Sequence, residues 1–98
     1  MIEMTLGQIA KVVGGRVINL QESKVTSAIP VIDSRKAKAG TFFVAFEGNS
    51  VDGHEFVKDA ISKGAEFALV SKEIEQPAIL VSNVLESLTA LAIHVRNQ

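Results

Sequence analysis

Residues 33–70 read DSRKAKAGTFFVAFEGNSVDGHEFVKDAISKGAEFALV, and this stretch decides the fold of the chain. An apolar segment, residues 41–46, has the composition of a strand that is covered on both faces. A glycine-bounded loop then leads to a helix that ends at residues 63–64, and residues 65–70 predict a second strand. Polar residues and glycines gather at the strand ends and at the helix N-terminus. Because packing alone does not require them there, they indicate a functional site.

The helix inside this stretch has a polar start and an apolar face. Asp52 and Glu55 have the spacing of a capping box, so we expect Asp52 to cap the helix. Phe56, Ala60 and Ile61 are then expected to face the core.

Two more helices are expected outside the stretch. A capping box, Thr5 and Gln8, precedes a helix that ends at Gly14-Gly15, and Asn83 with Glu86 caps a last helix. Each helix has one apolar face, formed by Leu6, Ile9, Ala10 and Val13 in the first and by Val84, Leu88, Leu91 and Val95 in the last.

Further strands are expected at residues 16–20, 28–32 and 78–81, with a polar loop at residues 21–27. Pro30 favours an edge position for the second of these strands or a place at a strand end, because proline cannot donate to a neighbouring strand. The first strands lack a helical crossover, which favours a mixed sheet. We therefore predict an α/β fold, a small layered domain with a mixed sheet flanked by helices, spanning the chain as one domain.

The composition excludes several classes of function. The chain has no cysteine, which excludes disulfides, thiolate zinc sites and cysteine nucleophiles and suits a cytoplasmic protein. Its net charge is -1 and its ten basic residues are scattered, so we expect no nucleic-acid partner. No apolar run approaches the roughly 18 residues of a membrane span. Neither of the two histidines has a carboxylate at ligand spacing, so no metal site is expected.

The triplet Asp33-Ser34-Arg35 follows an expected strand and combines a hydroxyl with a guanidinium. These groups can bind a phosphate or the edge of a pyrimidine, with arginine supplying a planar fork of donors. Two structural alternatives remain open. The aspartate and serine can bond their own backbone in a turn, and Arg35 can serve as the ion-pair partner of Asp33 or another carboxylate.

The loop that leads to His54 is a second candidate. Asn49 and Ser50 offer donors and acceptors for a uracil-like edge, while free N–H groups at the helix start attract anions. Asp52 competes with a phosphate for those N–H groups. We therefore expect a base or ribose near the loop and a phosphate nearer the Asp-Ser-Arg triplet. His54 either donates to a phosphate or packs as a neutral side chain.

These motifs together resemble the N-terminal domain of the Mur ligases, the ATP-dependent enzymes that build the stem peptide of peptidoglycan. The resemblance lies in the Asp-Ser-Arg triplet, the strand sequence AGTFFVA at residues 39–45, Asp52-Gly53-His54 and the helix ending in Gly64-Ala65. The opening residues 4–10 look most like the family member that adds D-alanyl-D-alanine.

The resemblance implies a binding role. In the family this domain holds the uridine diphosphate end of a UDP-N-acetylmuramoyl-peptide. ATP and Mg²⁺ bind to a central domain, and the incoming amino acid or dipeptide is brought by a C-terminal domain. By this resemblance the substrate-binding residues are Ser34, Arg35, Asn49, Ser50, Val51, Gly53 and His54. No catalytic residue or cofactor is expected in this chain itself, which contains no Gly-x-x-x-x-Gly-Lys-[Ser/Thr] phosphate loop.

Two other assignments remain open at this stage. The ligase that adds the third stem-peptide residue has the same domain, and a freestanding nucleotide-binding module would have no enzymatic parent. The last helix has no stop signal before Gln98, so we expect an ATP-binding central domain to follow in a longer cytoplasmic ligase.

Overall fold

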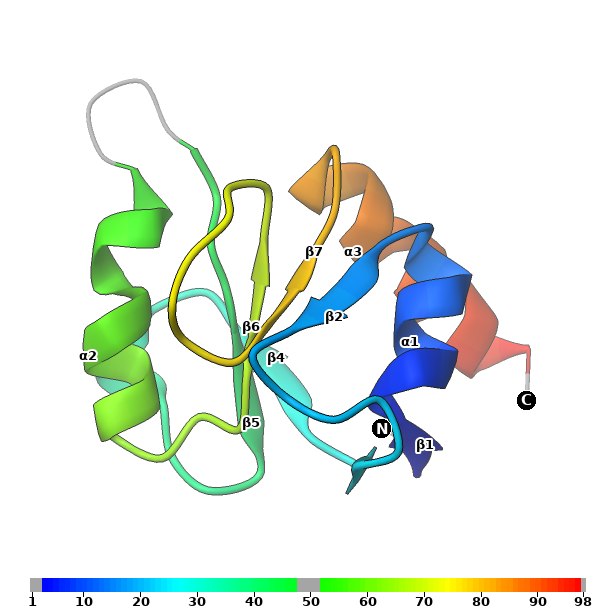
Figure 1. Cartoon of the computed structure of the whole chain (residues 1–98), viewed down its shortest axis with the longest axis horizontal. Coiled ribbons are helices and arrows are strands. Elements are labelled where there is room, and N and C mark those ends of the chain that lie inside the picture. The colour runs from blue at the N-terminus through cyan, green and yellow to red at the C-terminus, as the bar shows by residue number, and fades with distance from the viewer. Residues whose placement is uncertain (1–2, 48–51, 98) are drawn as a thin grey trace.

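The computed structural model describes residues 3–47 and 52–97, which form a mixed sheet between two layers of helix (Figure 1). The five strands lie in the order β2 (Arg16–Ile18), β7 (Ala78–Leu80), β6 (Ala68–Val70), β5 (Thr41–Val44) and β4 (Ile29–Val31). β2 is antiparallel to β7, and the other neighbours are parallel. β4 forms an edge of the sheet, where Pro30 needs no partner for its missing N–H. The predicted fold class is confirmed.

Helices cover both faces of the sheet. On one face lie α1 (Leu6–Val13) and α3 (Val84–Arg96), and on the other lies α2 (Val57–Ser62) (Figure 1). The predicted caps of α1 and α3 are present. Thr5 and Gln8 form a complete capping box at the start of α1, and at the start of α3 Asn83 Oδ1 accepts from the Glu86 N–H at 2.9 Å. Among the described residues, no helix has the length and apolar character that a membrane span requires.

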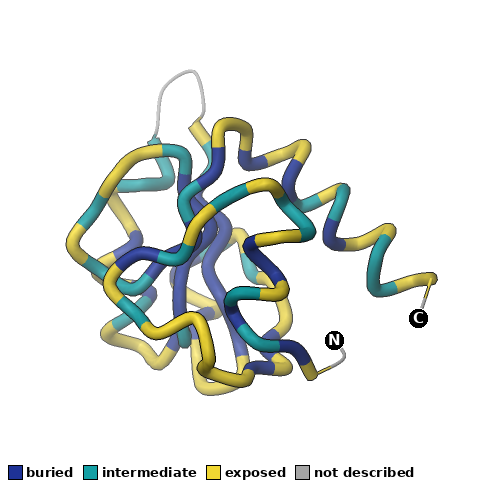
Figure 2. The backbone as a smooth tube through the Cα atoms, turned by 45° about the vertical axis from the view of Figure 1, so that its right-hand side comes forward, coloured by how far each residue is buried: buried dark blue, intermediate teal, exposed yellow. Residues whose placement is uncertain are grey.

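The central strands are buried on both faces, as their apolar sequences predict (Figure 2). Alternate side chains of β5 point to opposite layers, so that Phe42 packs toward α1 and α3 while Phe43 packs toward α2. Phe42 stacks on Phe67 with ring centroids 4.8 Å apart and ring planes 5° from parallel. Each helical layer thus has its own apolar core against the sheet.

The expected loop at residues 21–27 contains a short strand, which corrects the sequence prediction. β3 (Val25–Thr26) pairs antiparallel with β1 (Met4–Thr5) as a separate two-stranded sheet. A strand of two residues is too short to show a hydrophobic period, and its pairing depends on backbone groups that are distant in sequence, so the pattern could not reveal it.

The start of the α2 layer also differs from the prediction. Residues Gly53–Phe56 form a 3₁₀ turn, η2, before the α-helix begins. Asp52 Oδ1 accepts from the His54 N–H, whereas the Glu55 N–H bonds to the Asp52 carbonyl, so the expected capping box is absent although Asp52 is a cap. The tighter turn shifts the helical phase. Val57 is therefore buried and Phe56 is 40% exposed, and the prediction that Phe56 faces the core was wrong.

Candidate functional site

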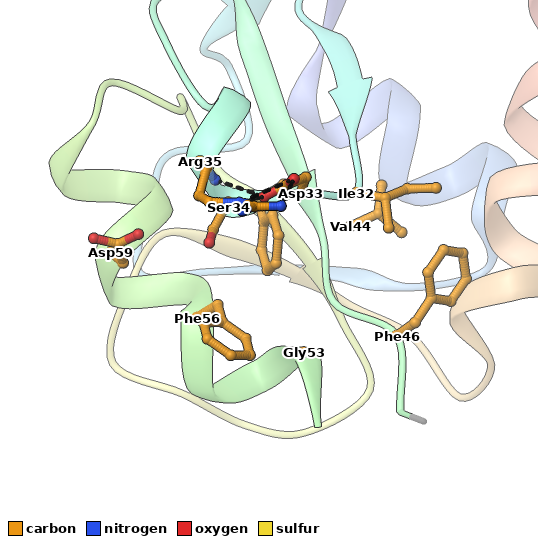
Figure 3. Close-up of a pocket in the computed structure, with 10 residues that line it drawn as sticks. Ile32, Asp33, Ser34, Arg35, Val44, Phe46, Gly53, Phe56 and Asp59 are labelled. Atoms are coloured by element: carbon orange, nitrogen blue, oxygen red, sulfur yellow. Dashed lines mark hydrogen bonds and ion pairs between the residues drawn. The ribbon is translucent and has the colours of Figure 1, made fainter. Parts of the chain in front are cut away.

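A cavity of about 590 Å³ lies beyond the carboxyl ends of β4 and β5 (Figure 3). The segments after these strands border the cavity on one side and η2 and α2 border it on another, and the two sides meet where Gly53 contacts Phe46. The lining residues are Ile32, Asp33, Ser34, Arg35, Phe43, Val44, Phe46, Gly53, Phe56 and Asp59. Ligands of open α/β sheets bind beyond the carboxyl ends of the strands. Its volume is typical of small-molecule sites.

The Asp33-Ser34-Arg35 triplet forms a 3₁₀ turn, η1 (Ser34–Lys36), at one wall of the cavity. Asp33 caps this turn by accepting from the Arg35 N–H at 2.9 Å. Its carboxylate also accepts from Arg35 Nε at 3.0 Å and from Nη2 at 2.8 Å. Ser34 is buried, and its hydroxyl points across the cavity toward the side of Phe56 and Asp59 (Figure 3). The strand end therefore presents a hydroxyl and a guanidinium held in place by one aspartate.

The ion pair changes the titration of both partners. Hydrogen bonds from the Arg35 side chain and backbone lower the pKa of Asp33 from 3.8 to about 2, and the same pair raises the pKa of Arg35. The Arg35 side chain is 84% exposed, and within the described part of the chain its Nη1 group makes no hydrogen bond. Arginine has five N–H donors, so the pair with Asp33 leaves donors for an anion outside the cavity.

Gly53 brings η2 against the end of β5. Its N–H donates to the Phe46 carbonyl at 2.7 Å. A Cβ atom at this position would lie 2.7 Å from that carbonyl oxygen and 2.8 Å from the Phe46 nitrogen, closer than a side chain can approach. Only glycine therefore permits this contact, which forms the back of the cavity.

His54 does not line the cavity and is held by its protein neighbours. Its Nδ1 lies 2.6 Å from Asp52 Oδ1, and its Nε2 accepts from the backbone N–H of Ser71 at 3.0 Å. An Nε2 that accepts has no proton, so Nδ1 carries the proton and the ring is neutral. Lys72 also pairs with Asp52, and these bonds hold the pKa of Asp52 well below its ordinary value. In this arrangement both ring nitrogens of His54 are engaged by protein groups.

The structure thus brings three of the predicted site residues, Ser34, Arg35 and Gly53, to one cavity. His54 is not among the lining residues, and Asn49, Ser50 and Val51 lie outside the described residues. Sequence reasoning missed Phe56 and Asp59 as lining residues. Their spacing could have indicated that they lie together, because residues three apart in the sequence share one face of a helix.

Comparison with known proteins connects this arrangement to one family. A family model described as "Mur ligase family, catalytic domain" matches residues 29–97. The UDP-N-acetylmuramoyl-tripeptide–D-alanyl-D-alanine ligase of Escherichia coli strain K12 is 34% identical over 100% of this chain and 22% of its own length. The UDP-N-acetylmuramoyl-L-alanyl-D-glutamate–2,6-diaminopimelate ligase of Bacillus cereus is 38% identical over 67% of this chain and 14% of its own length.

Solved structures show the same similarity. MurF from Acinetobacter baumannii superposes with a TM-score of 0.84 at 26% identity, over 100% of this chain and 22% of that one. MurF ligase from Thermotoga maritima in complex with ADP superposes with a TM-score of 0.59 at 28% identity, over 69% of this chain and 16% of that one. The chain therefore spans well under a third of the length of these relatives.

Proposed function

Because the chain belongs to the Mur ligase family, we propose that it binds the UDP end of UDP-N-acetylmuramoyl-tripeptide within a longer ligase that adds D-alanyl-D-alanine. The observation that carries this proposal is the cavity beyond β4 and β5, which joins an apolar lining to the Ser34 hydroxyl and the Arg35 guanidinium. A nucleoside diphosphate has the matching parts: a flat ring, a ribose with hydroxyl groups and a charged diphosphate.

The charges around the cavity suggest how such a ligand lies. Two carboxylates, Asp33 and Asp59, line the cavity together with one guanidinium, that of Arg35. A diphosphate inside the cavity would face two carboxylates and one guanidinium among the lining groups, with Asp59 also paired to Lys63 Nζ at 3.0 Å, whereas carboxylates suit the hydroxyl donors of a ribose. We propose that the base and ribose occupy the cavity beside Phe46 and Phe56. The diphosphate would then lie at its mouth, against the free donors of Arg35.

The remaining predicted residues join this proposal as follows. In the sequence, the three residues Asn49, Ser50 and Val51 lie between Phe46 and Gly53, which both line the cavity. We propose that these three residues contact the uridine. For His54 we propose an indirect role, because both of its ring nitrogens are engaged by protein groups.

We propose that ATP and Mg²⁺, which the family resemblance implies, bind outside this chain. The described residues contain no group of three or more His, Cys, Asp or Glu side chains able to hold a metal ion, and the sequence has no phosphate loop. The crystal structure of the Thermotoga maritima MurF ligase is that of a complex with ADP. In a longer ligase that includes this chain, ATP would bind to a part outside it. Within the ligase this domain would supply binding energy and position the substrate for the other two domains.

A second candidate is the same domain in a ligase that adds diaminopimelate as the third stem-peptide residue. The identity to the Bacillus cereus enzyme favours it. Both candidates bind the UDP end of a muramoyl-peptide, so the site proposed here is common to them. The peptide end of the substrate, which differs, would lie on other domains.

Titration of UDP into the ¹⁵N-labelled chain tests the proposal. We expect the amide signals of Ser34, Arg35 and Gly53 to shift first, and Arg35→Ala to weaken binding while Arg96→Ala, in α3, does not. Arg35→Lys keeps the charge but loses the planar fork, so it should still bind more weakly than the wild type. Shifts centred on α3 would contradict the placement of the site. A lower melting temperature for Arg35→Ala with unchanged UDP affinity would show that Arg35 is only a partner of Asp33.

A further inference from the structure

A closed ring of interactions lies behind the wall of the cavity that Phe46 and Gly53 form. Its members are Glu47, Asp52, His54, Ser71 and Lys72, which come from the end of the β5 segment, the start of η2 and the segment after β6. Glu47 and Asp52 face each other in an isolated antiparallel β-bridge. The Ser71 hydroxyl donates to Glu47 Oε1 at 3.0 Å, and the Ser71 N–H donates to His54 Nε2 at 3.0 Å.

His54 is the centre of this ring. Its side chain is only 6% exposed, and its two nitrogens join Asp52 on one side to the segment after β6 on the other. Lys72 Nζ binds the second oxygen of the Asp52 carboxylate, so that both carboxylate oxygens are used. His54 is nearly buried and both of its ring nitrogens are bonded, and a buried polar group with all its partners in place holds its neighbours in one arrangement.

The ring is joined to the cavity through the backbone. Asp52 precedes Gly53 and Glu47 follows Phe46, and the Gly53 N–H bonds to the Phe46 carbonyl at 2.7 Å between them. Phe46 and Gly53 line the cavity, whereas His54, Ser71 and Lys72 do not. The ring can therefore act on a bound ligand by fixing the position of this wall.

We propose that His54, Ser71 and Lys72 are positioning residues that hold the wall formed by the two residues Phe46 and Gly53 in the geometry that binds the ligand. The identity of the ligand as a uridine diphosphate rests on the proposed function. Nothing in the sequence pattern distinguished Ser71 or Lys72, which come from a different segment of the chain and meet the cavity wall only in the folded protein.

The first test needs no ligand. In ¹H–¹⁵N spectra of the histidine ring, we expect His54 to be the Nδ1–H tautomer. In Lys72→Met, the Gly53 amide proton should exchange at least severalfold faster than in the wild type, while that of Ala68 in β6 exchanges at the wild-type rate. An Nε2–H tautomer, or unchanged exchange at Gly53, would overturn the proposal.

The second test measures UDP affinity at a temperature where every variant is folded. His54→Gln keeps the side chain neutral but cannot form both the bond to Asp52 and the bond to Ser71. We expect His54→Gln and Lys72→Met each to raise the Kd for UDP roughly two- to tenfold, because the wall must then be ordered on binding. Lys72→Arg should restore affinity. Arg16→Met is the matched control: it removes the same charge from an exposed pair with Glu73 outside the ring and should leave Kd unchanged.

The outcomes separate the two proposals. If the wild type binds UDP and both His54→Gln and Lys72→Met bind it equally well, the positioning role is wrong and the proposed function stands. If the wild type does not bind UDP, the proposed function is wrong, and exchange at Gly53 alone decides whether the ring holds the wall.

Discussion

Replacing Gly53 by alanine tests the close approach that forms the back of the cavity. The added Cβ would lie 2.7 Å from the Phe46 carbonyl oxygen, 2.8 Å from its nitrogen and 3.1 Å from the Cα of Ala45. All three are backbone atoms of the segment that continues β5, so no side-chain rotation can relieve the contact. Either η2 or the end of β5 must move.

The expected loss of stability has two parts. Forcing extra volume into a packed contact costs about 1–3 kcal/mol, and weakening the hydrogen bond from Gly53 to Phe46 adds about 0.5–1.5 kcal/mol. Together they amount to about 1.5–4.5 kcal/mol, a large share of the roughly 5–15 kcal/mol that stabilises a small domain. For a chain of this size, that corresponds to a melting temperature lowered by about 6–36 °C.

Thermal and urea unfolding followed by circular dichroism would measure this loss. Gly7→Ala is a milder comparison, because Gly7 lies in α1 and its added Cβ would lie 3.2 Å from the Cβ and 3.4 Å from the carbonyl oxygen of Glu22, so the chain at Glu22 need move by only a few tenths of an ångström. Alanine is also the better helix former, so this variant should lose much less stability than Gly53→Ala. If Gly53→Ala melts within a degree or two of the wild type, the close approach does not constrain this position and the reasoning fails.

Two further predictions concern acid sensitivity and the aromatic core. The pKa of Asp33 is lowered from 3.8 to about 2 in the folded chain. The contribution of this carboxylate to stability is therefore complete above pH 4 and is lost as the pH falls toward 2. The pKa of Asp52 is lowered too, so Asp52 also stabilises the folded chain less as the pH falls. Acid unfolding of Asp33→Asn should therefore depend less steeply on pH between 4 and 2 than that of the wild type, and equal slopes would contradict the pair. In the core, a double-mutant cycle with Phe42→Leu and Phe67→Leu should show a coupling of about 0.5–1.5 kcal/mol in urea unfolding, because the rings stack. Additive single losses would mean that the stacked geometry contributes nothing beyond burial.

Local patterns in the sequence predicted most elements of the fold, because each of those elements depends on neighbouring residues. The capping box of Thr5 and Gln8, the cap at Asn83 and the apolar run of β5 involve groups within a few positions of one another. The edge position of β4 followed from Pro30 alone, through its missing N–H. The sequence motifs also indicated Ser34, Arg35 and Gly53, which the structure brings to one cavity.

Only the tertiary structure decided what depends on contacts between distant segments. The pairing of β1 with β3, the placing of Phe56 and Asp59 beside the ends of β4 and β5, and the bond from Ser71 to His54 join segments that are distant in the sequence. The 3₁₀ turn at Gly53 shifts the phase of the helix after it, which turned Phe56 outward against the periodic expectation. The sequence determined that Gly53 and His54 stand at a helix start. Their physical roles, a close backbone approach and a neutral bridge between two segments, exist only once β5, η2 and the segment after β6 pack together.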